Sequence, residues 1–246
     1  MSLSDLEAQQ AALAGVQLSD FRSANLFRLV TDRIPQDAAV LDVGCGAGGL
    51  VGHLCEHGYN VRGVDTSAAT VDAARAFLSG LGHDPQRISR ATTTDLLAAD
   101  DVADVVVSMD CLEHVEDDQA FFDELVQLTR PGGRLIITVP AMMSLYGERD
   151  RRIGHYRRYE RAGLAALAQN APIEVEELRY WNFLGVAPTF LTQKMFNRNI
   201  DEGFRYGTPS LRKRAMRALL HVWFRQVENR MTPPRGLTLL LTARRI

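Results

Sequence analysis

The sequence predicts an α/β protein whose core is a doubly wound, mostly parallel sheet. Short continuous apolar runs such as AVLDV and DVVVS are typical of parallel strands that are buried on both faces. Segments with apolar residues at helical spacing separate these runs, so strands and helices alternate along the chain. In folds of this class, ligands bind in the crevice at the carboxyl ends of the strands. We therefore expect the functional residues at that edge.

Each expected element has a local signal in the sequence. Apolar runs predict strands at 39–43, 60–64, 88–92, 104–108, 134–139, 173–181 and 236–244. Helical periodicity predicts helices at 4–14, 21–32, 48–57, 68–78, 118–128, 160–169, 183–196 and 209–228. Thr66 and Ser67 can cap the helix that starts at 68. The residues RPGG are expected to form the turn before the strand RLIITV.

Composition and charge describe an ordinary globular chain. It has 246 residues, 46% of them hydrophobic and 24% charged, and a formal net charge of −2. A dedicated nucleic-acid binder usually carries a clear positive excess, so nucleic acid is not an expected partner. The three cysteines make no C-x-x-C pair, so neither a disulfide framework nor a metal site is expected. The start resembles no signal peptide and no apolar run is long enough to span a membrane, so we expect a cytoplasmic protein.

The stretch VLDVGCGAGGL carries the clearest motif, because its glycines at 44, 46 and 49 fit G-x-G-x-x-G. Such a loop can hold a dinucleotide pyrophosphate, can hold another nucleotide ligand, or can be a structural tight turn. Asp42, Asp65 and Asp95 follow three successive strands and separate the first two alternatives. Carboxylates suit an ammonium, a ribose diol and an adenine amine, but repel a pyrophosphate. Asp65 alone would serve both ligands.

Five motifs in register, V-L-D-V-G-C-G-A-G, V-D-T-S, T-D-L, S-M-D-C-L-E-H-V and R-P-G-G-R-L-I-I-T-V-P, resemble those of class I S-adenosylmethionine-dependent methyltransferases. The likeness covers residues 38–141 and is nearest to the small-molecule branch with the ubiquinone-type enzymes. It implies a Rossmann-like sheet of seven strands with an antiparallel last strand. It also implies one methyltransferase domain over residues 1–246: N-terminal helices (1–36), a cofactor-binding core (38–141), an acceptor-side loop and helical insertion (142–235) and a last strand (236–244).

The resemblance also implies a cofactor site for S-adenosylmethionine. Its expected residues are Asp42, Gly44, Cys45, Gly46, Gly48, Asp65, Thr66, Asp95, Leu96, Met109 and Asp110. The glycines would let the backbone meet the methionine moiety, while Asp42 orients the loop or reaches the ammonium through water. Asp65 would accept from the ribose hydroxyls and Asp95 from the adenine amine. The alternative for Asp95 is a solvated loop acid.

Two histidines are candidates for catalysis, which needs a base only if the acceptor must lose a proton. His114, in LEHV, would lie on the methyl side of the cofactor; its alternative is a helix-start residue bonded to a backbone carbonyl. His155, in GHYRRY, lies in the loop where the resemblance implies the acceptor pocket. Loops carry binding residues disproportionately often, which favours contact with the substrate.

The segment ERDRRIGHYRRYER has six arginines between 149 and 161. Tyr146, His155, Tyr156, Arg157 and Arg158 are its candidate substrate residues, because arginine binds anionic groups in a fork. Arginines paired with neighbouring acids on a solvated loop are the alternative, and RNA binding is a third. The basic helix at 209–228 is expected to pack over the sheet or act as a lid, with peripheral membrane contact as its alternative.

The sequence thus predicts transfer of a methyl group to a small acceptor, anionic or amphipathic, by in-line displacement. A nicotinamide-dependent oxidoreductase that uses the same glycine loop is one alternative, although it leaves Asp42 and Asp95 without a role. A non-catalytic protein that binds S-adenosylmethionine is the other. Related enzymes methylate oxygen, nitrogen, carbon and sulfur on one fold, so the resemblance leaves the acceptor atom open, and the oligomeric state is open as well.

Overall fold

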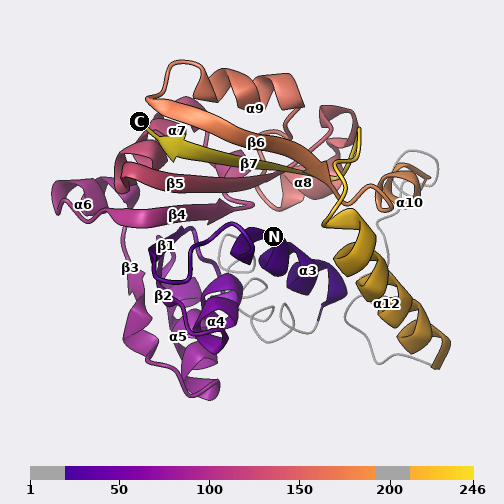
Figure 1. Ribbon diagram of the computed structural model, residues 1–246, viewed down its shortest axis with the longest axis horizontal. Helices are drawn as coiled ribbons and strands as arrows, with labels where there is room; N and C mark the ends of the chain where they lie inside the picture. Colours follow the sequence, from indigo (N-terminus) through magenta and orange to yellow (C-terminus); the bar gives the residue numbers. More distant parts are fainter. Residues whose placement is uncertain (1–19, 192–210) are drawn as a thin grey trace.

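A computed structural model describes residues 20–191 and 211–246 of the chain, and Figure 1 shows their arrangement. A seven-stranded sheet has the order β3-β2-β1-β4-β5-β7-β6. Neighbouring strands from β3 to β5 are parallel, and β7 is antiparallel to both β5 and β6. The doubly wound fold with an antiparallel last strand is therefore confirmed. The helix expected at 4–14 lies outside the described residues.

The strands are β1 (Ala39–Val43), β2 (Asn60–Asp65), β3 (Ile88–Arg90), β4 (Ala103–Met109), β5 (Thr129–Pro140), β6 (Ile173–Trp181) and β7 (Thr238–Arg245). The helices are α3 (Phe21–Thr31), α4 (Gly49–Glu56), α5 (Ala68–Gly80), α6 (Thr93–Ala98), α7 (Asp118–Leu128), α8 (Glu148–Arg152), α9 (Arg161–Ala168), α10 (Val186–Phe190) and α12 (Leu211–Trp223). Short helical turns are η1 (Pro85–Arg87), η2 (Leu112–His114), η3 (Met143–Leu145) and the π-helical η5 (Phe224–Glu228).

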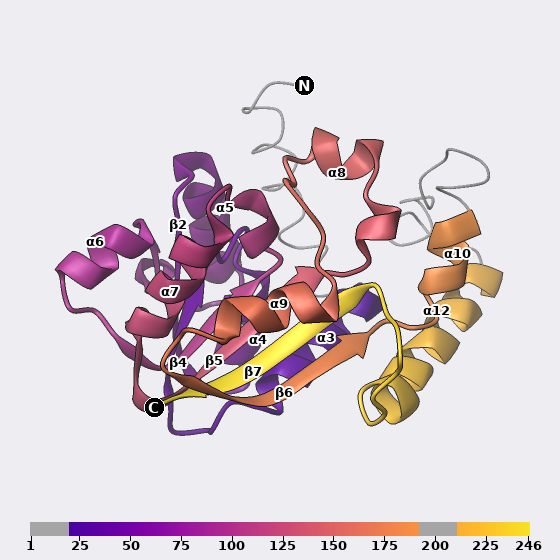
Figure 2. The same cartoon turned by 90° about the horizontal axis from the view of Figure 1, so that it is seen from above.

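Helices cover the sheet in two layers, as Figures 1 and 2 show. One apolar cluster joins side chains of α3, α4 and α5 to one face of the sheet. The second cluster joins α6, α7 and α9 to the other face. Within β4, Val105 and Val107 belong to the first cluster and Val106 to the second. Burial on both faces explains why the central strands read as continuous apolar runs.

One expectation about local structure was wrong, and one alternative interpretation does not hold. The residues RPGG form no separate turn, because β5 begins at Thr129 and includes them. This part of the strand is irregular, because Gly132 has φ +78° and the register between β4 and β5 shifts between Ala103 and Val105. The alternative interpretation placed Asp95 in a solvated loop after β3, but this segment is helical. It forms α6, in which Thr92 is the N-cap.

The basic helix α12 packs differently from the expectation that it covers the sheet. It contacts α3, and Trp223 at its end reaches the first apolar cluster. Leu211, Leu219 and Val222, which can share one face of this helix, are exposed. Of the helix expected at 183–196, the structure describes residues 183–191, and within them α10 covers Val186–Phe190. Residues 183–185 precede this helix as a bend and turn, and residues 192–196 lie outside the described residues. Among the described residues, no helix combines the length and apolar character that a membrane span requires.

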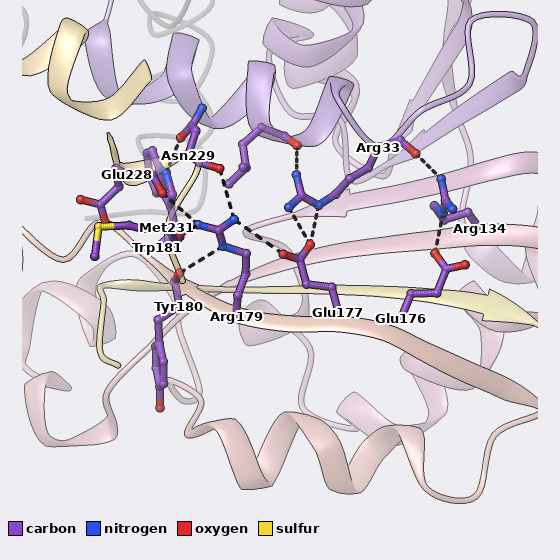
Figure 3. A network of polar contacts seen from close by, with 11 residues as sticks. Arg33, Arg134, Glu176, Glu177, Arg179, Tyr180, Trp181, Glu228, Asn229 and Met231 are labelled. Carbon is purple, nitrogen blue, oxygen red and sulfur yellow. Dashed lines mark hydrogen bonds and ion pairs between the residues drawn. The ribbon is translucent and has the colours of Figure 1, made fainter. Parts of the chain in front are cut away.

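A dense polar network joins β6 to the helices beside it, as Figure 3 shows. We call Arg33, Glu177, Arg179, Glu228 and Asn229 the Arg179 network. The buried Arg179 guanidinium donates to the backbone oxygens of Glu228 (2.9 Å) and Asn229 (3.3 Å) and pairs with the Glu177 carboxylate at 3.6 Å. Glu177 also pairs with Arg33 at 2.6 Å. The network therefore fixes α3 and η5 against β6.

Glu228 is the buried acid of this network, and both of its carboxylate oxygens accept hydrogen bonds. The backbone N–H of Phe183 donates to Oε1 at 2.6 Å, and the indole N–H of Trp223 donates to Oε2 at 3.1 Å. Asn229 extends the network, because its side chain accepts from the Trp181 indole at 2.8 Å. A buried polar group with all its partners in place adds rigidity to the fold at little cost.

Candidate functional site

The glycine loop joins β1 to α4 at the carboxyl edge of the sheet. Gly44, Gly46 and Gly48 have φ values of +73°, +54° and +79°, which residues with a side chain rarely adopt. A Cβ at Gly44 would lie 2.5 Å from Cys111 Sγ, so the loop packs directly on the segment after β4. A Cβ at Gly46 would meet no described atom within 4 Å. The backbone is therefore open toward a ligand at Gly46 and closed against the protein at Gly44.

Asp65, at the end of β2, ties the glycine loop to the start of α5. Its Oδ2 accepts from the backbone N–H of Gly46 at 3.1 Å, and its Oδ1 accepts from the backbone N–H of Ser67 at 2.9 Å. Ser67 is the N-cap of α5, as expected, while Thr66 is exposed. The Asp65 carboxylate is half-buried, so it holds the loop and still borders solvent.

Asp42, near the end of β1, is a buried carboxylate with an unfilled hydrogen-bond site. Its Oδ1 has no hydrogen-bond partner among the described residues, and the side chain is buried. Burial, followed by the charge of Asp65, raises the pKa of Asp42 from 3.8 to about 7. Cys45 beside it is also buried, and burial raises the pKa of its thiol. A positively charged group brought to this position would stabilise the ionised Asp42.

Asp95 and Leu96 lie on α6, not on a loop. Asp95 and Thr92 form a capping box, in which Asp95 Oδ2 accepts from the Thr92 backbone N–H at 2.9 Å and its hydroxyl at 2.7 Å. These hydrogen bonds lower the pKa of Asp95. Leu96 is buried in the second apolar cluster. Asp95 thus has a local structural role in addition to the expected contact with the cofactor.

The end of β4 carries Met109 and Asp110, the last two expected cofactor residues. Met109 is half-buried, and Asp110 is exposed with φ +49°, an uncommon backbone conformation for a residue other than glycine. The Asp110 backbone N–H donates to the Thr138 carbonyl at 2.9 Å, which holds the conformation. Because unusual backbone conformations gather at ligand sites, Asp110 marks this strand end for attention.

Both candidate catalytic histidines lie beyond this point and contact each other. The rings of His114 and His155 are 4.6 Å apart, edge to face. Burial, followed by the nearby His155, lowers the pKa of His114 to about 4. We call Glu113, His114, Asp150 and His155 the histidine cluster. It brings η2 together with the loop that carries α8, which projects from the sheet layer in Figure 2.

Asp150 anchors the cluster from α8. Its Oδ1 lies 3.1 Å from His155 Nδ1 and accepts from Arg158 Nε at 2.8 Å, and its Oδ2 accepts from the Gly147 backbone N–H at 3.0 Å. Burial alone would raise the pKa of Asp150, but the hydrogen bonds from His155 and Arg158 outweigh it and lower the value to about 2. The guanidinium of Arg158 is therefore committed to a buried carboxylate of the protein.

Glu113 is fully buried beside the two histidines. Neither of its carboxylate oxygens has a hydrogen-bond partner among the residues that the structure describes. Its Oε1 lies 3.7 Å from His155 Nε2. Burial and the charge of Asp110 raise its pKa well above the ordinary range.

The remaining candidate substrate residues surround the cluster. The hydroxyl of Tyr146 donates to the His155 carbonyl at 2.9 Å, so it braces the loop. Arg157 pairs with Asp118 at 2.7 Å, and Tyr156 is exposed. Both candidate arginines thus have carboxylate partners in the protein. Arg158 pairs with Asp150, an acid of the same segment, as the alternative interpretation expected, whereas the partner of Arg157, Asp118, comes from α7. An anionic acceptor would have to compete with Asp118 or Asp150.

Sequence reasoning did not single out Glu113 and Asp150 as site residues. Glu113 stands next to His114 in LEHV, and its burial could not be read from a dipeptide that looks solvated. Asp150 was considered only as a counter-charge for surface arginines. The cluster itself forms only because residues 141–158 fold back over η2.

Residues 41–137 match the protein family described as "Methyltransferase domain". An uncharacterized methyltransferase of Mycobacterium sp. (strain JLS) is 31% identical over 133 residues, which cover 54% of this chain and 51% of the relative. The ubiquinone biosynthesis O-methyltransferase of Brucella anthropi is 36% identical over 112 residues, 44% of each protein. The chain spans about half the length of the curated relatives that it matches.

Solved structures share the fold over more of the chain. A structure of an S-adenosylmethionine-dependent methyltransferase from Mesorhizobium loti covers 92% of this chain and 100% of its own, with a TM-score of 0.56 and 16% identity. The [4+2]-cyclase SpnF covers 91% of this chain and 81% of its own, with a TM-score of 0.59 and 20% identity. At such low identity the likeness concerns the fold alone.

Proposed function

We propose, from the premise that residues 41–137 match the family described as "Methyltransferase domain", that the chain is a class I S-adenosylmethionine-dependent methyltransferase and methylates a small-molecule acceptor. The family implies S-adenosylmethionine as the methyl donor. The observation that carries the proposal is the pairing of an open glycine loop with the buried carboxylate of Asp42, whose Oδ1 has no hydrogen-bond partner among the described residues. An α-ammonium group is the chemical complement of that carboxylate.

The cofactor site that we propose keeps the expected residues. The backbone at Gly44, Gly46 and Gly48 would border the methionine moiety, and Asp65 would accept from the ribose hydroxyls. The half-buried position of Asp65 supports this role, because its carboxylate already contacts the glycine loop and the residue is not closed off from solvent. The other cofactor residues that we propose are Asp42, Cys45, Thr66, Asp95, Leu96, Met109 and Asp110.

The reaction is an in-line displacement at the methyl carbon. A lone pair of the acceptor forms the new bond to the methyl carbon while the carbon–sulfur bond breaks. The electron pair of the broken bond stays on the sulfur, which becomes a neutral thioether. An acceptor O–H or N–H also loses its proton, to a side chain or to water. Most of the acceleration comes from aligning the reacting atoms in a site from which water is excluded, so few catalytic groups are needed.

We propose that the acceptor binds beside the histidine cluster. Asp150 orients His155 at 3.1 Å, which is the arrangement that gives an imidazole one defined free nitrogen. His114 and His155 are the proposed catalytic residues, and Tyr146, Tyr156, Arg157 and Arg158 the residues that shape the pocket. An oxygen or nitrogen acceptor is consistent with the relatives, since their names include an O-methyltransferase and the norajmaline N-methyltransferase of Rauvolfia serpentina.

The setting of the proposed enzyme is a reducing one. Cys45, Cys55 and Cys111 are free thiols, which fits the cytoplasm, the compartment that we propose. The partner is the small acceptor. The basic helix α12 has exposed apolar residues, and this combination suits peripheral contact with a lipid surface.

Calorimetric titration with S-adenosylhomocysteine tests the proposal, and NADH serves as the comparison ligand. We expect binding of the first and none of the second. Asp65→Asn should weaken the binding of S-adenosylhomocysteine by about 1–3 kcal/mol, the cost of leaving ligand hydroxyls without a charged acceptor. Asp101→Asn is the matched control, because Asp101 pairs with Arg62 at the surface. Equal affinity in wild type and Asp65→Asn would remove Asp65 from the site.

Transfer itself requires a metabolite screen with S-adenosylmethionine. A mass gain of one methylene in an acceptor, together with formation of S-adenosylhomocysteine, is the expected result. Binding without transfer to any acceptor would instead favour a non-catalytic protein. The shared fold of SpnF, which is named a cyclase, shows why that assay is needed: this fold does not fix the reaction.

A further inference from the structure

The histidine cluster contains a buried acid that lacks a partner. Both oxygens of Glu113 are without a hydrogen bond among the described residues, although the side chain is fully buried. The distance of 3.7 Å from Glu113 Oε1 to His155 Nε2 exceeds that of a hydrogen bond. Burying a carboxylate without a partner is costly, so such a group is retained where a ligand completes its surroundings.

The spacing of the side chains fits one ion between them. Glu113, His114 and His155 each offer one ligand atom, and these three atoms lie within 4.8 Å of one another. Two ligands about 2.1 Å from a shared ion stand about 3.4 Å apart at a tetrahedral angle and about 4.2 Å apart when opposite. The observed 3.7 Å falls inside this interval. Small side-chain rotations would bring the third ligand within range.

The surroundings of His155 match those of a metal ligand. Its Nδ1 faces Asp150, and its Nε2 is turned toward Glu113. Metal-binding histidines almost always use their second nitrogen on a carboxylate or carbonyl, which fixes the ring. Arg158 and the backbone N–H of Gly147 hold Asp150 in turn. A ligand and its supporting shell are therefore both in place.

We propose that Glu113, His114 and His155 bind a divalent transition-metal ion, of which Zn²⁺ is the representative, and that Asp150 positions His155. Two imidazoles and one carboxylate favour such an ion over Mg²⁺ or Ca²⁺, which prefer oxygen ligands. Three protein ligands leave a coordination position open, which is the arrangement of a catalytic and not of a structural site. Cysteine spacing gave no hint of this site, because none of its ligands is a cysteine.

The position of the site suggests what the ion binds. Cys111, two residues before Glu113, packs on Gly44 of the glycine loop, so the cluster lies at the same edge of the sheet as the loop. An ion there can take an oxygen or nitrogen of the acceptor in its open position and orient it. This last step rests on the proposed function, whereas metal binding itself does not.

The test is calorimetry on the full chain after removal of metal with a chelator. We expect one equivalent of Zn²⁺ to bind with a dissociation constant of about 1 µM or lower, and Mg²⁺ to give no heat. Glu113→Gln and His114→Ala should each weaken binding by about 100-fold or more. Asp150→Asn should weaken it by about 10–100-fold, the range for groups that support a ligand.

A second histidine pair supplies the matched control. His53 and His57 lie on and just after α4 with ring centres 4.4 Å apart, away from Glu113. His57→Ala should keep the high-affinity equivalent of Zn²⁺. The absorption spectrum of wild type with Co²⁺ gives an independent readout, which His114→Ala should change. Glu113→Gln is nearly isosteric, and its circular dichroism checks the fold.

Three results would overturn the metal site: no Zn²⁺ equivalent in wild type, unchanged affinity in Glu113→Gln, or loss of the equivalent in His57→Ala. If Glu113→Gln does not fold, a Co²⁺ spectrum that is unchanged in His114→Ala has the same force. Titration with S-adenosylhomocysteine separates the two proposals. If the protein binds S-adenosylhomocysteine but does not bind Zn²⁺, the metal site alone is refuted. If it binds Zn²⁺ but does not bind S-adenosylhomocysteine, the proposed function alone is refuted.

Discussion

Glu113 and Glu228 are both fully buried, yet their surroundings are opposite. Glu228 accepts one hydrogen bond on each oxygen, from Phe183 and from Trp223, and it belongs to the Arg179 network. Glu113 accepts none from the described residues, although two histidines stand beside it. The first arrangement is complete without a ligand. The second is complete only with one, which is how a structural and a functional buried charge can be told apart.

The energetic expectation follows from this difference. In the Arg179 network, removal of any member leaves other buried groups without partners, so stability depends on each of them. In the histidine cluster, replacing the unpartnered acid leaves nothing newly unpaired. Stability and ligand binding should therefore respond to mutation in opposite ways in the two regions.

The largest effect is expected at the centre of the network. Arg179→Met would remove the buried guanidinium from Glu177 and from four backbone carbonyls, those of Tyr180, Glu228, Asn229 and Met231. We expect the free energy of unfolding to fall by about 3–5 kcal/mol, measured by denaturant titration. Arg62→Met, which breaks only the surface pair with Asp101, is the control and should cost about 1 kcal/mol or less. Equal losses in both variants would mean that the network is not cooperative.

Matched substitutions of the two glutamates give the next effect. In Glu228→Gln, the amide –NH₂ cannot accept from one of the two N–H donors, so the free energy of unfolding should fall by about 1–3 kcal/mol. In Glu113→Gln, the same measurement on metal-free protein should show no fall, because no hydrogen bond is lost. Thermal or denaturant unfolding of both variants checks the pair. A fall in Glu113→Gln as large as that in Glu228→Gln would erase the distinction.

Asp42 adds a third buried acid to the comparison, and like Glu113 it has an oxygen without a hydrogen-bond partner among the described residues. Its pKa of about 7 means that the carboxyl is protonated at lower pH, whereas an ammonium ligand needs the carboxylate. We expect the affinity for S-adenosylhomocysteine to fall about tenfold for each pH unit below 7, as calorimetry over pH 5.5–8 would measure. Asp42→Asn should bind more weakly at pH 8 and lose the pH dependence. A flat profile in wild type would show that Asp42 does not meet a cation.

The same carboxyl affects the stability of the free protein with a definite sign. Its pKa is raised from 3.8 when unfolded to about 7 when folded, so the folded state binds the proton more tightly between these values. This contribution to the free energy of unfolding is complete below about pH 4 and is lost as the pH rises to about 7. Asp42→Asn should remove that part of the slope. A wild-type slope equal to that of the variant would contradict the shift.

The smallest effect is expected at the rim of the histidine cluster. Arg157 pairs with Asp118 in a partly exposed position, so Arg157→Met should change the free energy of unfolding by about 1 kcal/mol or less. Arg158→Met is the comparison, because its guanidinium is buried against Asp150 and its loss should cost clearly more. Unfolding of the two variants in parallel measures this. Two equal losses would show that burial does not separate these neighbours.

Much of the fold could be predicted from the sequence, because its signals are local. The helix at 118–128 and the strand at 173–181 were placed with the bounds that the structure has. α6 was missed because its capping residues also fit a loop, and six residues are too few to show a period. α12 was misjudged because spacing identifies an apolar face and does not say whether anything covers it.

In the candidate site, too, the features with a local signal in the sequence could be predicted and those that depend on the folded chain could not. The glycine loop, Asp42 and Asp65 could be placed because each lies at the carboxyl end of a strand, on the same edge of the sheet. The histidine beside Glu113 and the partners of Asp150 could not be predicted, because the segments that carry Glu113 and Asp150 meet only in the folded chain. Arg157 and Arg158 are adjacent in sequence, yet one reaches Asp118 and the other Asp150. Pairing of this kind depends on the path of the loop.

The position of β7 has a consequence for how the protein is made. β7 is synthesised after every other strand, yet it lies between β5 and β6 and pairs with both. Until the ribosome has released residues 238–245, both neighbours present open edges. Such edges recruit other chains, and contacts distant in sequence form slowly. Nascent chains that stall before β7 should therefore be clients of chaperones, and the sheet should close only after translation has passed this strand.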